Sequence, residues 1–505
     1  MRKQIFFITV LLFSCTILYA QDPVIIDPDS THQIIRGFGG NYIRPWRPEM
    51  TDSEIETAFG TDDGQLGFSI LRIMIQPDID DWIMNVSVAK KAYDMGVTII
   101  ASPWNPPEYM LDPDASNNKL SYDWYYDYAY HLEDFNYFME RNDVPIYAIS
   151  IQNEPDYGEW TRWTANEILT FMKENASEIT TRIMAPESFQ FRRAYSDPIL
   201  NDEEACENLD ILAGHIYGGG LYPYPLAVSK GKEVWMTEYY TDSQHSANLW
   251  PMALDVGTNM HKVMNAGMNT YVWWYIVRYY GPISDGTMDS GEKGDVTKRG
   301  YIMSQYSRFI RPGFYRIECT DEPQNNVFVT SYKNSSASKI IIVAVNTSSQ
   351  TKNQSFSVQN GVMDYFTPYV TSETKNCLRE NDSSVSSGSF SFTLDAQSVT
   401  TFVSSDNTAV ENKSSSLPGS FELLQNYPNP FNPSTRINFK IPEKSHVSIK
   451  IYNALGEEIQ ELAGRDYTAG SHSIILDASH LANGIYFYKI KAGNFKETRK
   501  MSLIK

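Results

Sequence analysis

The stretches VTIIAS at 97–102, YYDYAYHLEDFNYFMER at 125–141 and IYAISIQ at 146–152 decide the fold of this chain. The first and third are short apolar runs rich in Ile, which is typical of buried strands. The middle stretch is long and has apolar residues at helical spacing. Strand, helix and strand in this order predict a βαβ unit, whose two strands lie parallel in one sheet.

The same alternation continues from about residue 31 to residue 311. Helical stretches also lie at 164–179 and 247–268, and Thr164 and Glu167 have the spacing of a capping box. The predicted strands are Ile34–Gly39, Gly67–Ile75, Val97–Ser102, Ile146–Gln152, Arg182–Ala185, Ile211–Tyr217, Val234–Thr237 and Thr270–Ile276. Eight strands separated by helices favour an α/β fold of the (β/α)8 TIM-barrel type, for which about 250 residues is typical.

A doubly wound open sheet is the alternative fold. Such sheets usually carry a glycine-rich phosphate loop after their first strand. Here GFGG at 37–40 lacks the GxGxxG spacing, so we expect the catalytic barrel to span 31–311.

The rest of the chain predicts smaller β domains. Residues 312–404 contain short Val-, Ile- and Thr-rich runs parted by Asn/Ser turns, which is a β-sandwich pattern. We expect residues 21–30 to add a strand to this side domain. Residues 405–418 read as a polar linker, and alternating residues in 419–505 predict a small all-β domain.

The N-terminus predicts export. Arg2 and Lys3 precede an apolar run that ends at Leu18, and Ala20 provides a small residue at the cleavage point, so residues 1–20 are expected to be a signal peptide. A membrane anchor would need about 20 apolar residues, and lipidation at Cys15 is the less favoured alternative because the apolar run continues past it. We expect no transmembrane segment.

Cysteines and metal motifs are sparse. Beyond the signal peptide only Cys206, Cys319 and Cys377 remain, too few for a disulfide framework. At most one bridge is expected, with Cys319–Cys377 as the candidate. CxxC, HExxH and EF-hand patterns are absent from the sequence, so we expect no metal and no other cofactor.

The charge distribution narrows the possible partners. The chain has 42 Lys+Arg against 61 Asp+Glu, a net charge of −19, which argues against a duplex nucleic-acid binder. Residues 21–416 carry a net charge of −24, whereas residues 417–505 carry +3. Acidity together with abundant Tyr and Trp favours an exported protein that handles sugars.

Two predicted strands end in a glutamate. The fourth strand runs into Asn153-Glu154-Pro155, and the seventh ends at Glu238. Reacting groups of TIM barrels lie at the carboxyl ends of strands. Most glycosidases use two facing carboxylates as their catalytic groups. Either glutamate alone could be an ordinary surface residue in so acidic a protein. The pair, with Asn153 as a donor for a sugar hydroxyl, favours catalysis.

Aromatic residues gather near the same rim. Trp46 follows the first strand, Trp104 follows the third, and Trp273 and Trp274 lie on the eighth. Strand alternation turns one of the paired tryptophans toward the helices, so that one is expected to be core. We expect Trp46, Trp104 and Trp274 to contact substrate.

Ordered motifs across 34–403 resemble glycoside hydrolase family 30, in particular its glucuronoxylan-specific endo-β-1,4-xylanases. The motifs are GFGG (37–40), GFSILRI (67–73), ASPWNPP (101–107), YAISIQNEPDY (147–157), APESFQF (185–191), GHIYG (214–218), WMTEYY (235–240), YVWWYI (271–276), KRGYIMSQYSRFIRPG (298–313), IIVAVN (341–346) and SVTTFV (398–403). The resemblance implies a retaining enzyme with Glu154 as acid/base and Glu238 as nucleophile.

The resemblance also implies a site for a glucuronosyl side group. Arg278 matches the arginine that pairs with its carboxylate, flanked by Trp274 and Tyr280. Tyr240 and Ser243 match the other contacts, although the loop after Tyr240 is about two residues shorter and Val277 stands where members often carry a second Arg. Bidentate hydrogen bonds suit an arginine to this role. Tyr217, in the motif GHIYG, is a further expected substrate contact.

The last domain is similar to the C-terminal sorting domain of type IX secretion cargo. Its motifs are NYPNPFNP (426–433), YNALG (452–456) and LANGIY (481–486). A polysaccharide-binding module is the alternative, but no Trp lies beyond Trp274.

Together these features predict a monomeric endo-glucuronoxylanase exported by the type IX machinery, either released or kept on the cell surface. Alternatives are another family 30 glycosidase, such as one acting on unsubstituted xylan or β-1,6-glucan, and a non-hydrolytic glycan-binding protein.

Overall fold

The computed structural model describes residues 22–115, 118–241, 243–361, 363–405, 421–426, 429, 431, 433–467, 470–493 and 495–504. The expected signal peptide and all but the first residue of the expected linker lie outside these residues. The chain divides into two compact units, Met1–Asn407 and Thr408–Lys505.

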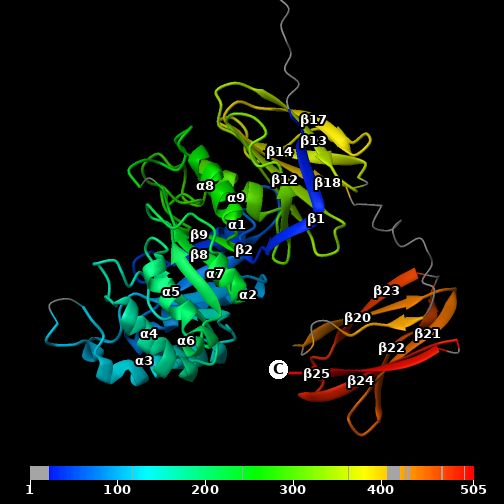
Figure 1. Ribbon diagram of the computed structural model, residues 1–505, viewed down its shortest axis with the longest axis horizontal. Helices are drawn as coiled ribbons and strands as arrows, with labels where there is room; N and C mark the ends of the chain where they lie inside the picture. Colours follow the sequence, from blue (N-terminus) through cyan, green and yellow to red (C-terminus); the bar gives the residue numbers. More distant parts are fainter. Residues whose placement is uncertain are drawn as a thin grey trace, which may run out of the picture. The chain divides into compact units, whose positions relative to one another are not determined.

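The first unit contains a closed barrel of eight parallel strands, which confirms the predicted TIM barrel (Figure 1). Its strands are β2 (Gly37–Tyr42), β3 (Ile70–Ile75), β4 (Thr98–Pro103), β5 (Ala148–Ser150), β6 (Arg182–Ser188), β7 (Ile211–His215), β8 (Glu233–Tyr239) and β9 (Thr270–Tyr275). Closure is made by parallel pairing of β9 with β2, for example Tyr271 with Phe38.

Two apolar layers explain why the barrel strands are so hydrophobic. Inward-facing residues such as Ile100, Met184 and Trp235 fill the barrel. Their strand neighbours face outward and pack beneath the helices, as Trp273 does. Strands buried on both faces must be apolar almost throughout, which leaves charged residues only where they have partners.

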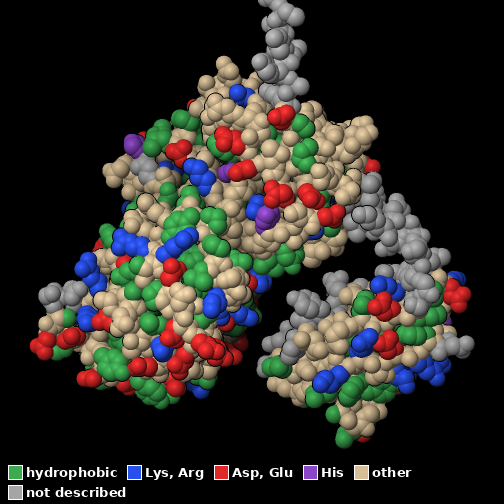
Figure 2. Space-filling model, viewed as in Figure 1, with side chains coloured by type: hydrophobic (Ala, Val, Ile, Leu, Met, Phe, Trp, Pro, Cys, Tyr) green, Lys and Arg blue, Asp and Glu red, His purple; other side chains and the backbone are tan. Residues whose placement is uncertain are grey.

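Helices surround the barrel and continue to the side domain. They are α1 (Asp52–Phe59), α2 (Ile83–Asp94), α3 (Tyr125–Arg141), α4 (Ala165–Glu174), α5 (Arg193–Asn201), α6 (Glu203–Glu207), α7 (Pro225–Ser229), α8 (Leu254–Asn265) and α9 (Lys298–Ser307), with the 3-10 turns η1 (Ile79–Asp81), η2 (Glu108–Met110), η3 (Tyr122–Trp124) and η4 (Ala176–Glu178). The predicted capping box is present, since Thr164 accepts from the amide of Glu167 and the Glu167 side chain accepts in return. On the face shown in Figure 2, acidic side chains gather over the region of α3, α4 and α6.

Some element boundaries differ from the expected ones. Helix α8 begins at Leu254 rather than near residue 247, because Pro251 disfavours helical backbone at the residue before it. The fourth barrel strand is only three residues long. The first barrel strand begins at Gly37 rather than Ile34, because Ile34 ends β1 of the side domain and residues 35–36 connect the two strands.

The side domain is a β-sandwich, as predicted. Its strands are β1 (Val24–Ile34), β10 (Tyr315–Cys319), β11 (Val327–Lys333), β12 (Ile340–Asn346), β13 (Lys352–Val358), β14 (Tyr365–Thr371), β15 (Leu378–Arg379), β16 (Ser383–Ser384), β17 (Ser389–Leu394) and β18 (Ser398–Ser404). Strand β1 pairs antiparallel with β10 and parallel with β13, so the N-terminal strand joins this sheet. Helix α9 packs on it, with Gln305 donating to Thr371 Oγ1 at 2.8 Å.

The second unit is all-β, as predicted. Its strands are β19 (Glu422–Leu423), β20 (Ser434–Ile441), β21 (Ser445–Tyr452), β22 (Glu458–Tyr467), β23 (Gly470–Asp477), β24 (Gly484–Ala492) and β25 (Phe495–Leu503). They form one sheet of three strands and one of four. Ile437, Ile449, Tyr488 and their neighbours form an apolar core of its own.

The structure also bears on the expected disulfide and on membrane-spanning helices. Cys206, Cys319 and Cys377 are all buried free thiols, so the candidate Cys319–Cys377 bridge is not formed. Within the described ranges, every helix is too short or too polar to span a bilayer.

Candidate active site

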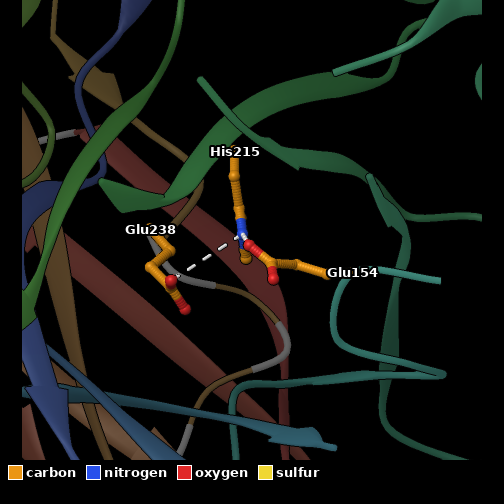
Figure 3. A group of neighbouring side chains, drawn as sticks. All are labelled: Glu154, His215 and Glu238. Carbon is orange, nitrogen blue, oxygen red and sulfur yellow. Dashed lines mark hydrogen bonds and ion pairs between the residues drawn. The ribbon is translucent and has the colours of Figure 1, made fainter. Parts of the chain in front are cut away.

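The two predicted carboxylates meet at the carboxyl ends of the barrel strands. Glu154 follows β5, Glu238 lies near the end of β8, and His215 ends β7 between them (Figure 3). One oxygen of each carboxylate and a ring nitrogen of His215 all lie within 4.8 Å of one another. His215 Nδ1 is 2.8 Å from Glu154 Oε1 and 4.0 Å from Glu238 Oε1. The geometry therefore brings both glutamates to one point.

The backbone around Glu154 is held in an uncommon conformation. Its φ is 47°, in the left-handed region, which costs a non-glycine residue about 1–3 kcal/mol. Two hydrogen bonds hold the turn: the amide of Asn153 donates to Pro103 O at 2.7 Å, and that of Glu154 donates to Glu187 O at 3.1 Å. Neighbouring strand ends thus aim Glu154 into the barrel mouth.

A buried arginine, Arg72 of β3, holds the nucleophile candidate. Its Nη1 donates to Glu238 Oε2 at 2.8 Å, and its Nη2 donates to Asn153 Oδ1 at 2.7 Å. The same Nη2 lies 3.2 Å from a third carboxylate, Glu187 of β6. On the opposite side, Tyr217 OH donates to Glu238 Oε1 at 2.9 Å. Each Glu238 oxygen therefore accepts a hydrogen bond.

Burial and charge oppose each other in this cluster. Burial lowers the pKa of His215, but Glu238, Glu154 and Glu187 outweigh it and raise the pKa to about 10. Burial raises the pKa of Glu187, yet Arg72 and His215 bring it well below its usual range. Burial and the Glu154 charge raise the pKa of Glu238, against the opposing effects of His215 and Arg72. The counterions thus favour ionised Glu187, whereas at Glu238 burial and the Glu154 charge outweigh them.

A cleft of about 640 Å³ opens above this cluster. It is lined by Trp46, Arg47, Trp104, Glu154, Tyr157, Glu159, Trp160, Phe189, Tyr217, Glu238, Tyr240, Trp274 and Tyr275. The expected contacts Trp46, Trp104, Tyr217, Tyr240 and Trp274 therefore all line it. Volumes of about 300–1,000 Å³ are typical of ligand sites.

Packing of the tryptophans makes this wall rigid. Trp46 stacks on Trp160 with ring centroids 5.5 Å apart and meets Trp104 edge-on at 5.6 Å. Trp274 faces the same group, at 5.9 Å from Trp104. Trp273 is fully buried beneath the helices, as strand alternation predicts. Trp160 Nε1 also donates to Glu154 Oε2 at 3.3 Å.

Asn153 precedes Glu154 in the chain, and its side chain binds Arg72. Its Oδ1 accepts from Arg72, while its buried Nδ2 has no hydrogen-bond partner among the described residues. That donor is available to a ligand hydroxyl.

Arg278 lies beside the main cleft, on a smaller cavity of about 210 Å³ that shares Arg47 and Tyr275 with it. Its Nη1 pairs with Asp285 Oδ2 at 3.0 Å, and its guanidinium lies 4.7 Å from the Tyr279 ring centroid. Its Nε is buried and unpartnered within the described ranges. One donor atom of Arg278 is thus paired with Asp285, and another is buried without a hydrogen-bond partner among the described residues.

The remaining expected contacts lie nearby. Tyr280 stacks on Tyr240 with ring centroids 5.3 Å apart, and its ring is 5.9 Å from the Arg278 guanidinium. The carbonyl of Ser243 accepts from Tyr279 OH at 2.7 Å. Tyr240, Arg278 and Tyr280 are therefore brought together, while Ser243 is tied to them through Tyr279.

Glu154, His215 and Glu238 are also residue types that bind metal ions. A histidine ligand must be neutral. The pKa of about 10 keeps His215 protonated near neutral pH, so its ring nitrogens are donors.

Sequence reasoning missed three buried groups: Arg72, Glu187 and His215. Each was present in a quoted motif, and Arg72 stood alone as a charge in the apolar strand GFSILRI. A charge inside a strand buried on both faces needs a partner, which was the available signal. Nothing comparable marked Glu187, whose role depends on two distant strands.

Comparisons with known proteins agree with this geometry. The Glycosyl hydrolase family 30 beta sandwich domain matches residues 313–402, and the Secretion system C-terminal sorting domain matches residues 425–505. Glucuronoxylanase XynC of Bacillus subtilis (strain 168) is 46% identical over 401 residues, covering 77% of this chain and 93% of the relative.

Solved structures are similar as well. A GH30 endoxylanase from Clostridium papyrosolvens C71 is 39% identical, with a TM-score of 0.69, over 76% of this chain and 100% of that one. A glycoside hydrolase family 30 subfamily 8 xylanase from Clostridium acetobutylicum is 34% identical, with a TM-score of 0.69, over 76% of this chain and 99% of that one. The barrel, the sandwich and these relatives together show that the chain is a glycoside hydrolase and belongs to family 30.

Proposed function

We propose that this enzyme is a secreted retaining endo-β-1,4-xylanase that cleaves glucuronoxylan, with Glu154 as acid/base and Glu238 as nucleophile. One observation carries the mechanism: one oxygen of Glu154 and one oxygen of Glu238 lie within 4.8 Å of each other. Retaining glycosidases hold their carboxyl groups about 5–5.5 Å apart, whereas inverting ones need about 6.5–9.5 Å to admit water.

In the first step, a Glu238 oxygen attacks the anomeric carbon as the glycosidic bond breaks. Arg72 and Tyr217 donate to the Glu238 carboxylate and so aim it, while Glu154 gives its proton to the departing oxygen. The products are a glycosyl ester on Glu238 and a shortened chain with a free hydroxyl.

In the second step, Glu154 is ionised and takes a proton from water. The water oxygen attacks the same carbon, and the ester bond to Glu238 breaks. Glu154 regains its proton and Glu238 its charge, so the enzyme is restored. Two inversions at one carbon retain its configuration.

Substrate recognition is divided between apolar and charged surfaces. Trp46, Trp104 and Trp274 offer flat faces to xylose rings, and Asn153 Nδ2 offers a donor to a hydroxyl. Arg278 receives the carboxylate of the glucuronosyl group, with Tyr240, Ser243 and Tyr280 around it. The name of the 46% identical relative, a glucuronoxylanase, supports this substrate.

The ends of the chain direct its export. Residues 1–20 act as the signal peptide, residues 405–418 as a linker, and residues 419–505 as the domain that the type IX machinery reads. The match of residues 425–505 to a secretion sorting domain supports this route. The enzyme then works as a monomer outside the cell or attached to its surface.

Mass spectrometry of digests of glucuronoxylan and of unsubstituted xylan tests the proposal. We expect oligomers that each carry one glucuronosyl group at a fixed distance from the reducing end, and little cleavage of the plain polymer. Equal digestion of both polymers would overturn the side-group requirement. Release of products from β-1,6-glucan instead would indicate another activity of the family.

A further inference from the structure

A group of exposed aromatic side chains lies outside the active-site cleft. Among the described residues nine aromatic side chains are exposed, and six of them fall within residues 109–137: Tyr109, Tyr122, Trp124, Tyr126, Tyr130 and Tyr137. The cleft above Glu154 and Glu238 is lined by other residues, so the proposed mechanism does not use these six. Single exposed aromatics are ordinary, whereas a dense group of them marks a binding surface.

Contacts between neighbouring rings hold this aromatic surface in place. Tyr109 meets Trp124 edge-on, with ring centroids 5.4 Å apart. On α3 the rings of Tyr126 and Tyr130 lie 4.8 Å apart, and Tyr126 OH donates to Tyr130 OH at 3.0 Å. Tyr130 OH donates in turn to Glu178 Oε2 at 3.0 Å. The rings are thus held by their neighbours and their hydroxyls while they remain exposed.

A groove of about 430 Å³ opens beside Tyr122, which lies at the start of η3. Tyr122 is 61% exposed, and its hydroxyl donates to Glu174 Oε2 at 2.8 Å, which tethers the ring to α4. Asn166 and Thr170 line the groove as well. These two residues and Glu174 recur every four positions along α4, so they share one face of the helix. The groove therefore combines an aromatic ring with polar side chains of the adjoining helix.

The polar side chains of the groove are available to a ligand. Those of Ser121, Asn166 and Thr170 make no hydrogen bond to any other part of the chain that the structure describes, and all three line the groove. A sugar ring has a flat face of C–H groups and hydroxyls around its edge. It is bound by an aromatic face together with a few hydrogen-bonding groups, which is the combination found here.

The charge of the groove restricts the kind of sugar. Asp112, Asp123 and Glu167 line it together with a single cation, Lys119, whose Nζ is 2.7 Å from Glu167 Oε1. Further acidic side chains gather over this region of α3 and α4 (Figure 2). This excess of negative charge repels ligands that carry carboxylates or phosphates. An uncharged sugar chain is the ligand that fits.

We propose that this groove, with the aromatic surface around it, is a second saccharide-binding site that takes an uncharged stretch of xylan. Tyr122 supplies the flat face, and Asn166 and Thr170 bind hydroxyls. The site keeps the enzyme on the polymer between branch points while the cleft engages a branched segment. The choice of xylan among uncharged sugar chains rests on the proposed function.

The test is native gel electrophoresis of the full chain through gels that contain soluble unsubstituted xylan. All proteins carry Glu238→Gln, so that the polymer is not cut. A short xylo-oligosaccharide with a glucuronosyl group is added in excess to fill the cleft, which leaves the acidic groove to bind the uncharged polymer. We expect Tyr122→Ala to raise the apparent Kd for xylan by about 5- to 30-fold, the range for truncating an aromatic anchor.

Tyr365→Ala is the matched control, because Tyr365 is also an exposed tyrosine but lies on β14 of the side domain. Its migration should equal that of the Glu238→Gln chain. Tyr122→Phe keeps the ring and loses only the bond to Glu174, so it should retain most of the affinity. A loss in Tyr122→Phe as large as that in Tyr122→Ala would contradict the role of the ring face.

Asn166→Ala probes the opposite wall of the groove independently of Tyr122. It should raise the apparent Kd by about two- to tenfold, the value of one neutral hydrogen bond. Equal migration of Tyr122→Ala, Asn166→Ala and the Glu238→Gln chain would overturn the inference.

Two further outcomes separate this inference from its alternatives. Binding of an oligoarginine peptide instead of xylan, lost in Tyr122→Ala, would overturn it by showing a site for a basic partner. A chain that binds unsubstituted xylan through Tyr122 but whose parent does not hydrolyse glucuronoxylan would overturn the proposed function and leave the second binding site standing.

Discussion

Two parts of the site handle charge in opposite ways. The inner site (Arg72, Glu154, Glu187, His215 and Glu238) is sealed, with side chains that are at most 7% exposed. At the outer site, Arg278 is 27% and Asp285 18% exposed, and they form a single ion pair. Removing one charge from the inner site leaves another uncompensated, whereas water can compensate at the outer site.

This difference assigns different tasks to the two sites. Fixed, dry charges suit the chemistry, because they need no reorganisation as charge develops. A partly exposed arginine with an exchangeable partner suits recognition, because a substrate carboxylate can replace or join Asp285. Substitutions in the inner site should therefore lower activity on all xylans equally. Substitutions in the outer site should lower activity only on the branched substrate, glucuronoxylan.

The largest effect is expected from a substitution in the inner site. Glu238→Gln removes the proposed nucleophile, so kcat should fall by about four orders of magnitude or more on every xylan tested. Reducing-sugar release measures it. Glu233→Gln on the same strand is the control, because Glu233 pairs with Arg36 at the opposite end of β8. Near-normal turnover by Glu238→Gln would show that the nucleophile lies elsewhere.

A smaller and selective effect is expected at the outer site. Arg278→Ala should lower kcat/KM on glucuronoxylan by about 10- to 150-fold, the value of a hydrogen bond to a charged group. Activity on unsubstituted xylan should hardly change. Arg193→Ala is the control, since Arg193 also lies over tyrosine rings, those of Tyr222 and Tyr224. Equal losses on both polymers would remove Arg278 from recognition.

The smallest effect is expected at Asp285, the ion-pair partner of Arg278 in the outer site. In the proposed recognition, Asp285 competes with the substrate carboxylate for Arg278. Asp285→Asn should therefore lower KM on glucuronoxylan by about two- to fivefold, the value of an exposed ion pair. The amide of Asn can still orient the guanidinium. Initial rates across substrate concentrations give KM. A higher KM would mean that Asp285 holds Arg278 in place rather than competing with it.

Much of the fold could be predicted from local patterns. The alternation of apolar strands with amphipathic helices predicts the barrel, and the capping box at Thr164 predicts the start of α4. Boundaries were less accessible, because β1 and β2 follow one another with almost no break and only tertiary pairing assigns them to different sheets. Sequence periodicity does not carry that information.

Candidate site residues could be predicted from the sequence where they lie at or just after the end of a predicted strand. Glu154 follows β5 and Glu238 lies near the end of β8, each beside unusual neighbours, so their meeting at the barrel mouth could be predicted. Glu187 and His215 acquire their roles only when β6 and β7 bring them to β3 and β5. Similarly, the pairing of Arg278 with Asp285 depends on how the loop after β9 folds back.

The most direct test of the central claim is the anomeric configuration of the first product, followed by proton NMR from the moment of mixing. Two carboxylates this close predict double displacement, so the new reducing end should appear as the β-anomer and only later equilibrate. Initial appearance of the α-anomer would show inversion, and Glu238 could then not be the nucleophile.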